Sequence, residues 1–164
     1  MRFISVLLIS LLVLSSCSKT PPPTTEEKIL MNAFTAFVAG RVYDKTCDKG
    51  TITSAKEPNV NLYGNMQLFG GRVGSLWLMR HPGKSVEEGL AALLAIQEKI
   101  EARVKTSLEK DGCDSETGKN AANALKLYTT VHPAMINEMI DKEIVKQGGT
   151  VTPPEDIEAA SKKK

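Results

Sequence analysis

The chain has 164 residues, of which 41% are hydrophobic and 24% are charged, and its formal net charge is +2 at pH 7. This composition is typical of a globular protein that can bury one hydrophobic core. The near balance of 21 basic and 19 acidic residues gives no electrostatic footprint for nucleic acid. We therefore expect no nucleic-acid partner.

The chain begins with one positive charge and a short apolar segment. Arg2 is followed by residues 3–14, which are apolar except for two serines. These features are typical of a secretory signal peptide. A transmembrane helix is the alternative, but it needs roughly 20 apolar residues and would have to include the polar residues 15–19.

The apolar segment ends in Leu14-Ser15-Ser16-Cys17, which resembles the lipobox of bacterial lipoproteins. The resemblance implies that the Cys17 thiolate receives a diacylglyceryl group, that cleavage follows Ser16 and that the new amino terminus is acylated. Three acyl chains would hold the protein on a membrane more or less permanently. The alternative is an ordinary secreted protein, cut by the general signal peptidase, in which Cys17 is incidental.

The residue after the cysteine bears on location. Ser18 stands where the inner-membrane retention pattern of enterobacterial lipoproteins carries aspartate, so by resemblance we expect the outer membrane, facing the periplasm or else the cell surface. Residues 1–16 are then the signal peptide and residues 17–25 a lipidated stalk. Prolines 21–23 favour an extended polyproline II conformation in that stalk, which would stand the folded part off the membrane.

The first helix is expected to follow a capping-box signature, Thr24-Thr25-Glu26-Glu27, and to run to about Lys45. Apolar residues recur after the signature with helical spacing. Asp48-Lys49-Gly50 ends the helix and places Cys47 at its C-terminal end. Residues 51–58 are polar and are expected to form a loop.

The segment 59–80 gives conflicting signals. The apolar residues that recur there with helical spacing are Leu62, Met66, Phe69, Val73 and Leu76. Four glycines oppose a helix, because each costs about 1 kcal/mol relative to alanine in a helix interior. A hairpin turning at Gly64-Asn65 is the alternative, but neither of its faces would be uniformly apolar. We expect a helix that is broken at its glycines or packs closely against a neighbour there.

The third helix is expected between a second capping box, Ser85-Val86-Glu87-Glu88, and the Asp111-Gly112 pair that precedes Cys113. Its apolar residues fall on one face and its charged residues on the other. The residues expected to point inward are Val86, Leu90, Leu93, Leu94, Ile100, Val104 and Leu108.

Two further helices complete the predicted fold. Asp114 or Ser115 can cap a fourth helix, and Pro133 ends it and starts a fifth. Their expected inward residues are Ala121, Ala124, Leu125, Tyr128, Val131, Ile136, Met139, Ile140 and Ile144. The prediction is an all-α bundle of four or five helices over residues 26–149, on the proline-containing stalk and followed by a disordered tail over residues 150–164.

Two cysteines remain once Cys17 is assigned to the lipid. An exported chain meets an oxidising compartment, so we predict a disulfide between Cys47 and Cys113 that ties the first helix to the end of the third. Metal ligation and a reactive thiol are the alternatives. Neither cysteine has a second cysteine or a histidine at ligand spacing, and no CxxC motif occurs.

No catalytic constellation can be assembled from this sequence. His81 and His132 each precede a proline, which biases them toward extended backbone at helix boundaries. No HExxH, GxSxG or phosphate-binding loop pattern occurs. We therefore expect a protein that is not an enzyme, holds no metal and uses no cofactor; a metal site or a general base at one of the histidines is the alternative.

A partner surface is expected around Leu76-Trp77-Leu78-Met79. Four consecutive apolar residues cannot all face one core stripe, so another helix buries some of them or a partner contacts them. Tryptophan and arginine dominate binding hot spots, and arginines flank this segment on both sides. We therefore predict Arg72, Trp77 and Arg80 as partner-binding residues.

This layout resembles that of the pilotins of secretion systems, which are small lipoproteins, some of them disulfide-tied helical bundles, that escort secretin subunits to the outer membrane. The resemblance rests on the lipobox and on a mature domain with one disulfide. It implies a non-enzymatic envelope lipoprotein with a membrane anchor and a groove for an envelope partner's helix. The alternatives are an inhibitor or exclusion lipoprotein with contacts in loop 51–58, and a small-ligand carrier or enzyme with a cavity near a histidine.

Overall fold

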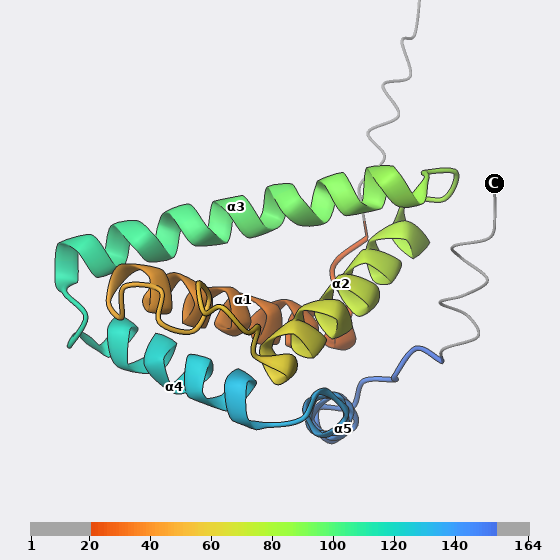
Figure 1. Ribbon diagram of the computed structural model, residues 1–164. Helices are drawn as coiled ribbons and strands as arrows, with labels where there is room; N and C mark the ends of the chain where they lie inside the picture. Colours follow the sequence, from red (N-terminus) through yellow and green to blue (C-terminus); the bar gives the residue numbers. More distant parts are fainter. Residues whose placement is uncertain (1–20, 154–164) are drawn as a thin grey trace, which may run out of the picture.

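Five helices make up the part of the protein that the computed structural model describes, residues 21–153 (Figure 1). They are α1 (Thr25–Thr46), α2 (Val60–Arg80), α3 (Val86–Asp111), α4 (Glu116–Thr130) and α5 (Pro133–Lys146). No strand occurs between residues 21 and 153, and the prediction of a helical bundle is confirmed. None of these five helices is long and apolar enough to cross a membrane. The predicted signal peptide, the lipidation site Cys17 and residues 154–164 lie outside the described residues.

The first helix, α1, is the centre of the bundle and packs between α3 and α4 (Figure 1). Its apolar face is almost completely buried, as the helical spacing predicted. The most buried residues of this face are Leu30, Phe34, Phe37 and Val38. Burying such side chains is the main favourable term in folding, so the fold is assembled around α1.

Aromatic rings form the middle of the core. Phe69 of α2 lies 5.3 Å from Phe37 and 5.9 Å from Phe34 between ring centroids, and Tyr128 of α4 meets Phe37 edge to face. The Tyr128 hydroxyl donates a hydrogen bond of 3.0 Å to the carbonyl of Ala33, which satisfies the one polar atom of the ring. Burial raises the pKa of Tyr128 to about 12.

The closest approach between two helices occurs where α1 crosses α4. A Cβ added to Gly40 would lie 2.7 Å from the backbone nitrogen and 2.9 Å from the Cα of Leu125. Because backbone cannot yield as a flexible side chain can, only glycine fits at this crossing.

The helix ends follow the predicted signals. Glu27 N donates to Thr24 Oγ1 while Thr24 N donates to Glu27 Oε2 at the start of α1, and Ser85 forms the same reciprocal pair with Glu88 at the start of α3. Ser115, rather than Asp114, caps α4. These side chains satisfy amide groups that have no partner within the helix.

The predicted disulfide between Cys47 and Cys113 is present, with the two Cα atoms 6.0 Å apart. It joins the C-terminal end of α1 to the residue that follows the end of α3. The loop after α1 is also held from inside. Asp44, which is fully buried, accepts four hydrogen bonds from Thr51, Ile52 and Thr53.

The segment 59–80 is one continuous helix, so the hairpin alternative and the expected break at its glycines are both wrong. Close packing is found at Gly64, where an added Cβ would lie 2.6 Å from Cγ of Pro133. Added Cβ atoms at Gly70, Gly71 and Gly74 would have nothing within 4 Å. Most of the glycines of α2 therefore face open space rather than a neighbouring helix.

Several residues that the helical pattern placed inside are exposed. On α3, Val86, Leu90 and Leu94 are 51%, 55% and 48% exposed, although Leu93 and Ile100 of the same helix are buried. The physical reason is that the N-terminal half of α3 extends beyond α4 (Figure 1), so that this flank has no helix to cover it. The other exceptions are Met66 of α2 and Met139 of α5, both exposed.

Candidate functional site

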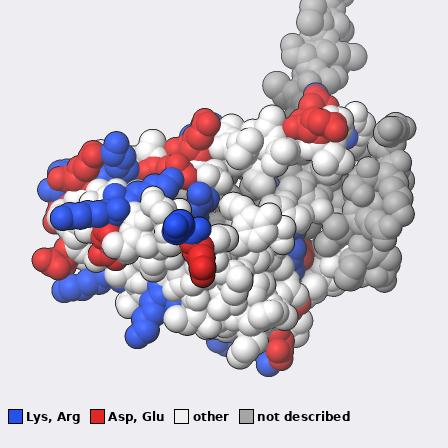
Figure 2. All heavy atoms as spheres, in the orientation of Figure 1, with Lys and Arg blue, Asp and Glu red and all other residues white. Residues whose placement is uncertain are grey.

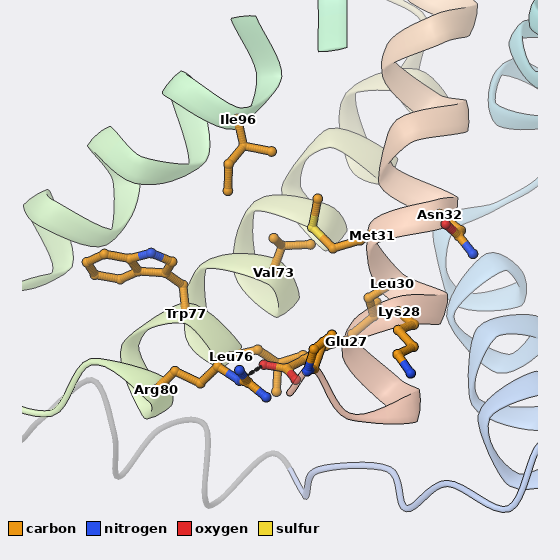
Figure 3. Close-up of a pocket in the computed structure, with 11 residues that line it drawn as sticks. Glu27, Lys28, Leu30, Met31, Asn32, Val73, Leu76, Trp77, Arg80 and Ile96 are labelled. Carbon is orange, nitrogen blue, oxygen red and sulfur yellow. Dashed lines mark ion pairs between the residues drawn. The ribbon is translucent and has the colours of Figure 1, made fainter. Parts of the chain in front are cut away.

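An apolar cleft of about 470 Å³ lies between the first half of α1, the second half of α2 and the middle of α3 (Figure 3). The residues that line the apolar cleft are Pro23, Glu27, Lys28, Leu30, Met31, Asn32, Val73, Leu76, Trp77, Arg80 and Ile96. Its volume falls within the range of roughly 300–1,000 Å³ that is typical of ligand sites. Polar side chains at the rim and apolar side chains within give the cleft the composition of a binding site.

Side chains from three helices converge on the apolar cleft. Figure 3 shows Met31 of α1, Val73 of α2 and Ile96 of α3 around the same space, with Trp77 beside them. These residues belong to segments far apart in the sequence. The cleft exists because α2 diverges from α1 towards the end at which α3 begins (Figure 1).

Trp77 is held in place from two sides. Its ring stacks on that of His81, with centroids 4.1 Å apart, and Nδ1 of His81 donates a hydrogen bond of 2.7 Å to the Trp77 carbonyl. On the side of α3, an added Cβ at Gly89 would lie 3.5 Å from the Trp77 ring. A large apolar ring fixed in this way is pre-organised to contact an occupant of the cleft.

The four consecutive apolar residues 76–79 divide as the sequence requires. Leu78 is buried against Gly89 of α3, and Met79 is 42% exposed. Leu76 and Trp77 are half-buried and line the apolar cleft. The segment 76–79 therefore packs against α3 through Leu78 and lines the cleft through Leu76 and Trp77.

Arg80 fastens the stalk to the rim of the apolar cleft. Its guanidinium donates hydrogen bonds of 2.7 Å to the carbonyls of Pro21 and Pro22, and it forms an ion pair with Glu27 of α1 (Figure 3). Pro23 itself lines the cleft. The described part of the stalk is thus docked on the helices rather than held away from them.

Arg72 is placed inside the protein and not at the apolar cleft. Its guanidinium contacts Glu26 at 2.9 Å, Asp141 at 2.6 Å and Asn137 at 2.8 Å. Of the three predicted partner-binding residues, Trp77 and Arg80 are brought together at the cleft, whereas Arg72 has internal partners. A guanidinium held in this way has little capacity left for a partner protein.

The segment after α5 also docks on α1. Thr152 donates hydrogen bonds from its backbone nitrogen and its hydroxyl to the carboxylate of Glu26, and Val151 packs against the core. The sequence predicts a disordered tail from residue 150, but these contacts place residues 151 and 152 against α1. The reason is that Glu26 has two carboxylate oxygens and Arg72 occupies only one of them.

Neither histidine belongs to a potential metal site in residues 21–153. His81 follows the end of α2, and Nδ1 of His132 accepts a hydrogen bond from Ala134 N at the start of α5. No group of three His, Cys, Asp or Glu side chains within the described range could hold a metal ion. Both histidines lie at helix boundaries, as their position before proline predicted.

Charge is unevenly distributed over the surface. Figure 2 shows Lys, Arg, Asp and Glu side chains gathered towards the end where α3 approaches α4, while the area over α2 is largely uncharged. Between Val60 and Met79, Arg72 is the single charged residue, and it is buried. An uncharged helix face is unusual on a solvent-exposed surface.

No protein-family model, curated protein or solved structure matches this chain. The apolar cleft and its surroundings are therefore the basis for assigning a function.

Proposed function

We propose that the protein is a non-enzymatic envelope lipoprotein whose helical domain binds an apolar segment of a partner protein in the apolar cleft. The observation that carries this proposal is the cleft itself, with Trp77 fixed at its wall. Tryptophan is among the residues that most often dominate binding hot spots.

The chemistry of the rim indicates what the partner segment contributes. Arg80 and Glu27 are paired with each other, and Arg80 also binds two stalk carbonyls. Lys28 is the one further charged residue of the lining, so we expect recognition to rely mainly on burial of apolar side chains. An amphipathic helix offers such side chains at positions i, i+3, i+4 and i+7.

Lipidation at Cys17 is the second part of the proposal. It is supported by the resemblance of Leu14-Ser15-Ser16-Cys17 to a lipobox. Outer-membrane attachment facing the periplasm follows from the same resemblance. We expect Cys17→Ala to abolish incorporation of radiolabelled palmitate, and labelling that survives the substitution would contradict a lipid at this residue.

Site-directed photo-crosslinking in intact cells tests the partner. A photoreactive amino acid at position 31 or 76 lies in the apolar cleft, whereas position 94 lies on the exposed flank of α3 and serves as the control. We expect one defined envelope protein to be captured from the cleft positions and not from position 94. Trp77→Ala should reduce this capture, whereas Met79→Ala should not. Equal capture at all three positions would contradict docking in the cleft.

Binding of a small apolar ligand is a second candidate, because the size and lining of the apolar cleft also suit one. The chain has one tryptophan, Trp77, so its fluorescence reports occupancy directly. A saturable spectral shift on adding an apolar ligand, without capture of any protein from positions 31 and 76, would favour the carrier over the partner-binding protein.

A further inference from the structure

We propose that, while no partner is bound, one acyl chain attached to Cys17 occupies the apolar cleft. This inference rests on the proposed lipid anchor. It means that the proposed binding site has two states, one occupied by the protein's own acyl chain and one by the partner. Partner and acyl chain then compete for the same space.

The position of the stalk brings the anchor close to the cleft. Arg80 holds the carbonyls of Pro21 and Pro22, and Pro23 forms part of the lining. From Pro21 back to Cys17 the chain is only four residues long, which spans at most about 14 Å when fully extended. The attachment point is therefore confined to the neighbourhood of the cleft rim.

The lining of the cleft suits a hydrocarbon chain. Met31, Val73, Leu76, Trp77 and Ile96 present apolar surface from three helices. A methylene chain brings no polar group into this space, so it leaves no hydrogen bond unsatisfied. A peptide segment carries backbone N–H and C=O groups, which must be hydrogen-bonded within a helix before the segment can be buried in the cleft.

The tether favours the protein's own chain over a lipid from solution or from a membrane. A short flexible linker gives an effective concentration in the millimolar range, roughly, and the tether here is four residues. Free acyl chains and phospholipids lack this advantage. Whenever the anchor is outside a bilayer, the cleft thus offers it a nearby apolar environment.

The three cysteines and the single tryptophan allow a direct experiment. Because Cys47 and Cys113 are bonded to each other, Cys17 is the remaining thiol when residues 17–164 are produced without lipid. It can be alkylated through a thioether with a hexadecyl chain, either plain or brominated. Bromine quenches indole fluorescence at close range, so Trp77 reports whether the chain lies in the cleft.

We expect the brominated chain to lower Trp77 fluorescence by about half or more relative to the plain chain. The reason is that a tether of this length gives an effective concentration in roughly the millimolar range, which favours occupancy of the cleft. The quenching should be independent of dilution, since the chain is on the same molecule. Equal fluorescence with the two chains would overturn the proposal. Quenching that disappears on dilution would also overturn it, because the chain would then come from a second molecule.

Two matched glutamate substitutions on α3 locate the chain. Ile96→Glu places a carboxylate in the cleft and should restore fluorescence, whereas Leu90→Glu alters an exposed position outside it and should not. Persistent quenching in Ile96→Glu would contradict occupancy of the cleft. Should circular dichroism show that Ile96→Glu is unfolded, Met31→Gln, which puts an amide among the lining residues, takes its place with the same expected result.

A relocated chain tests the role of the tether. In a Cys17→Ser background, Lys126→Cys presents a thiol on the exposed side of α4, a helix that does not line the cleft. The same brominated chain at this position should leave Trp77 fluorescence unchanged, and equal quenching there would show that the stalk is not what directs the chain. Because the acyl chain is attached chemically, these fluorescence outcomes do not depend on lipidation in cells. A failed quenching experiment therefore contradicts occupancy of the cleft, whereas a failed palmitate-labelling experiment contradicts the lipid anchor at Cys17.

Discussion

The guanidinium of Arg72 and the carboxylate of Glu26 meet at 2.9 Å inside the protein, where the two side chains are 10% and 5% exposed. Asp141 of α5 binds the same guanidinium, and Thr152 binds the same carboxylate. Two ion pairs that share the Arg72 guanidinium, together with the Thr152 hydrogen bonds, therefore connect α1, α2, α5 and the segment after α5. Because the charges are buried, loss of one partner leaves the other without compensation.

Arg72→Met tests the strength of this connection. We expect the free energy of unfolding in urea to fall by about 3–5 kcal/mol, the usual effect of removing one partner of a buried ion pair. Lys142→Met removes the cation of an exposed pair with Glu138 on α5 and is the control, for which we expect no measurable change. An Arg72→Met protein as stable as the control would contradict the role assigned to the ion pair.

Two glycine-to-alanine substitutions should have opposite effects. Gly40→Ala introduces a Cβ only 2.7 Å from the backbone of Leu125, and we expect it to destabilise the protein by about 1–3 kcal/mol. Gly71→Ala meets nothing within 4 Å in the interior of α2, and it should stabilise by about 0.5–1 kcal/mol through helix propensity. Urea denaturation of the two variants measures both effects. A change of the unfolding free energy in the same direction for both variants would contradict the packing described for Gly40 and Gly71.

Removing the disulfide should weaken the fold without changing it. The bond closes a loop with a sequence separation of 66 residues, and the chain-entropy model gives it a stabilisation of about 4 kcal/mol. We expect Cys47→Ala combined with Cys113→Ala to lose up to that amount in urea denaturation. Thiol alkylation and mass measurement of the native protein provide the check, since two alkylated cysteines at these positions would show that the bond is not formed.

The buried carboxylate of Asp44 predicts a pH dependence. Burial alone would raise the pKa of Asp44, but hydrogen bonds from Thr53, Ile52 and Thr51 outweigh it and hold the pKa below the ordinary value of 3.8. Because the pKa is lower in the folded state, the carboxylate contributes fully above the ordinary value, and its contribution is lost as the pH falls through the folded pKa.

Asp44→Asn should therefore be less stable than the wild type at neutral pH, by about 2 kcal/mol from the loss of charge-assisted hydrogen bonds. The difference should shrink as the pH falls below 3.8, because the wild-type carboxyl then takes up a proton. Urea denaturation of both proteins across this range measures it. A difference that is constant with pH would show that the ionised carboxylate does not stabilise the loop.

The helices themselves could be predicted because their signals are local. Thr24 with Glu27, and Ser85 with Glu88, mark two helix starts through contacts within one turn. The exposure of the α3 flank that contains Leu90 and Leu94 could not be predicted in the same way. Leu90 and Leu94 continue the apolar stripe of α3 but are exposed. Whether another helix covers this stripe depends on the position of α4, which cannot be predicted from the sequence of α3.

The site was predictable only in part, for a related reason. Residue type predicts Trp77 and Arg80, which lie at the cleft, but it equally predicts Arg72, which lies inside the protein. Its acidic partners come from α1 and α5, which no spacing near residue 72 reveals. The cleft residues Met31 and Ile96 carried no signal at all, because an apolar residue at helical spacing reads the same whether it packs on a helix or borders a hollow.

The cross-link between Cys47 and Cys113 lies at one extremity of the bundle, and the hollow beside Trp77 lies towards the other. The first extremity is covalently closed, whereas at the other one noncovalent contacts hold the corner between α2 and α3 against α1. We therefore expect any adjustment of the molecule to an occupant to take place at that corner rather than at the cross-linked extremity.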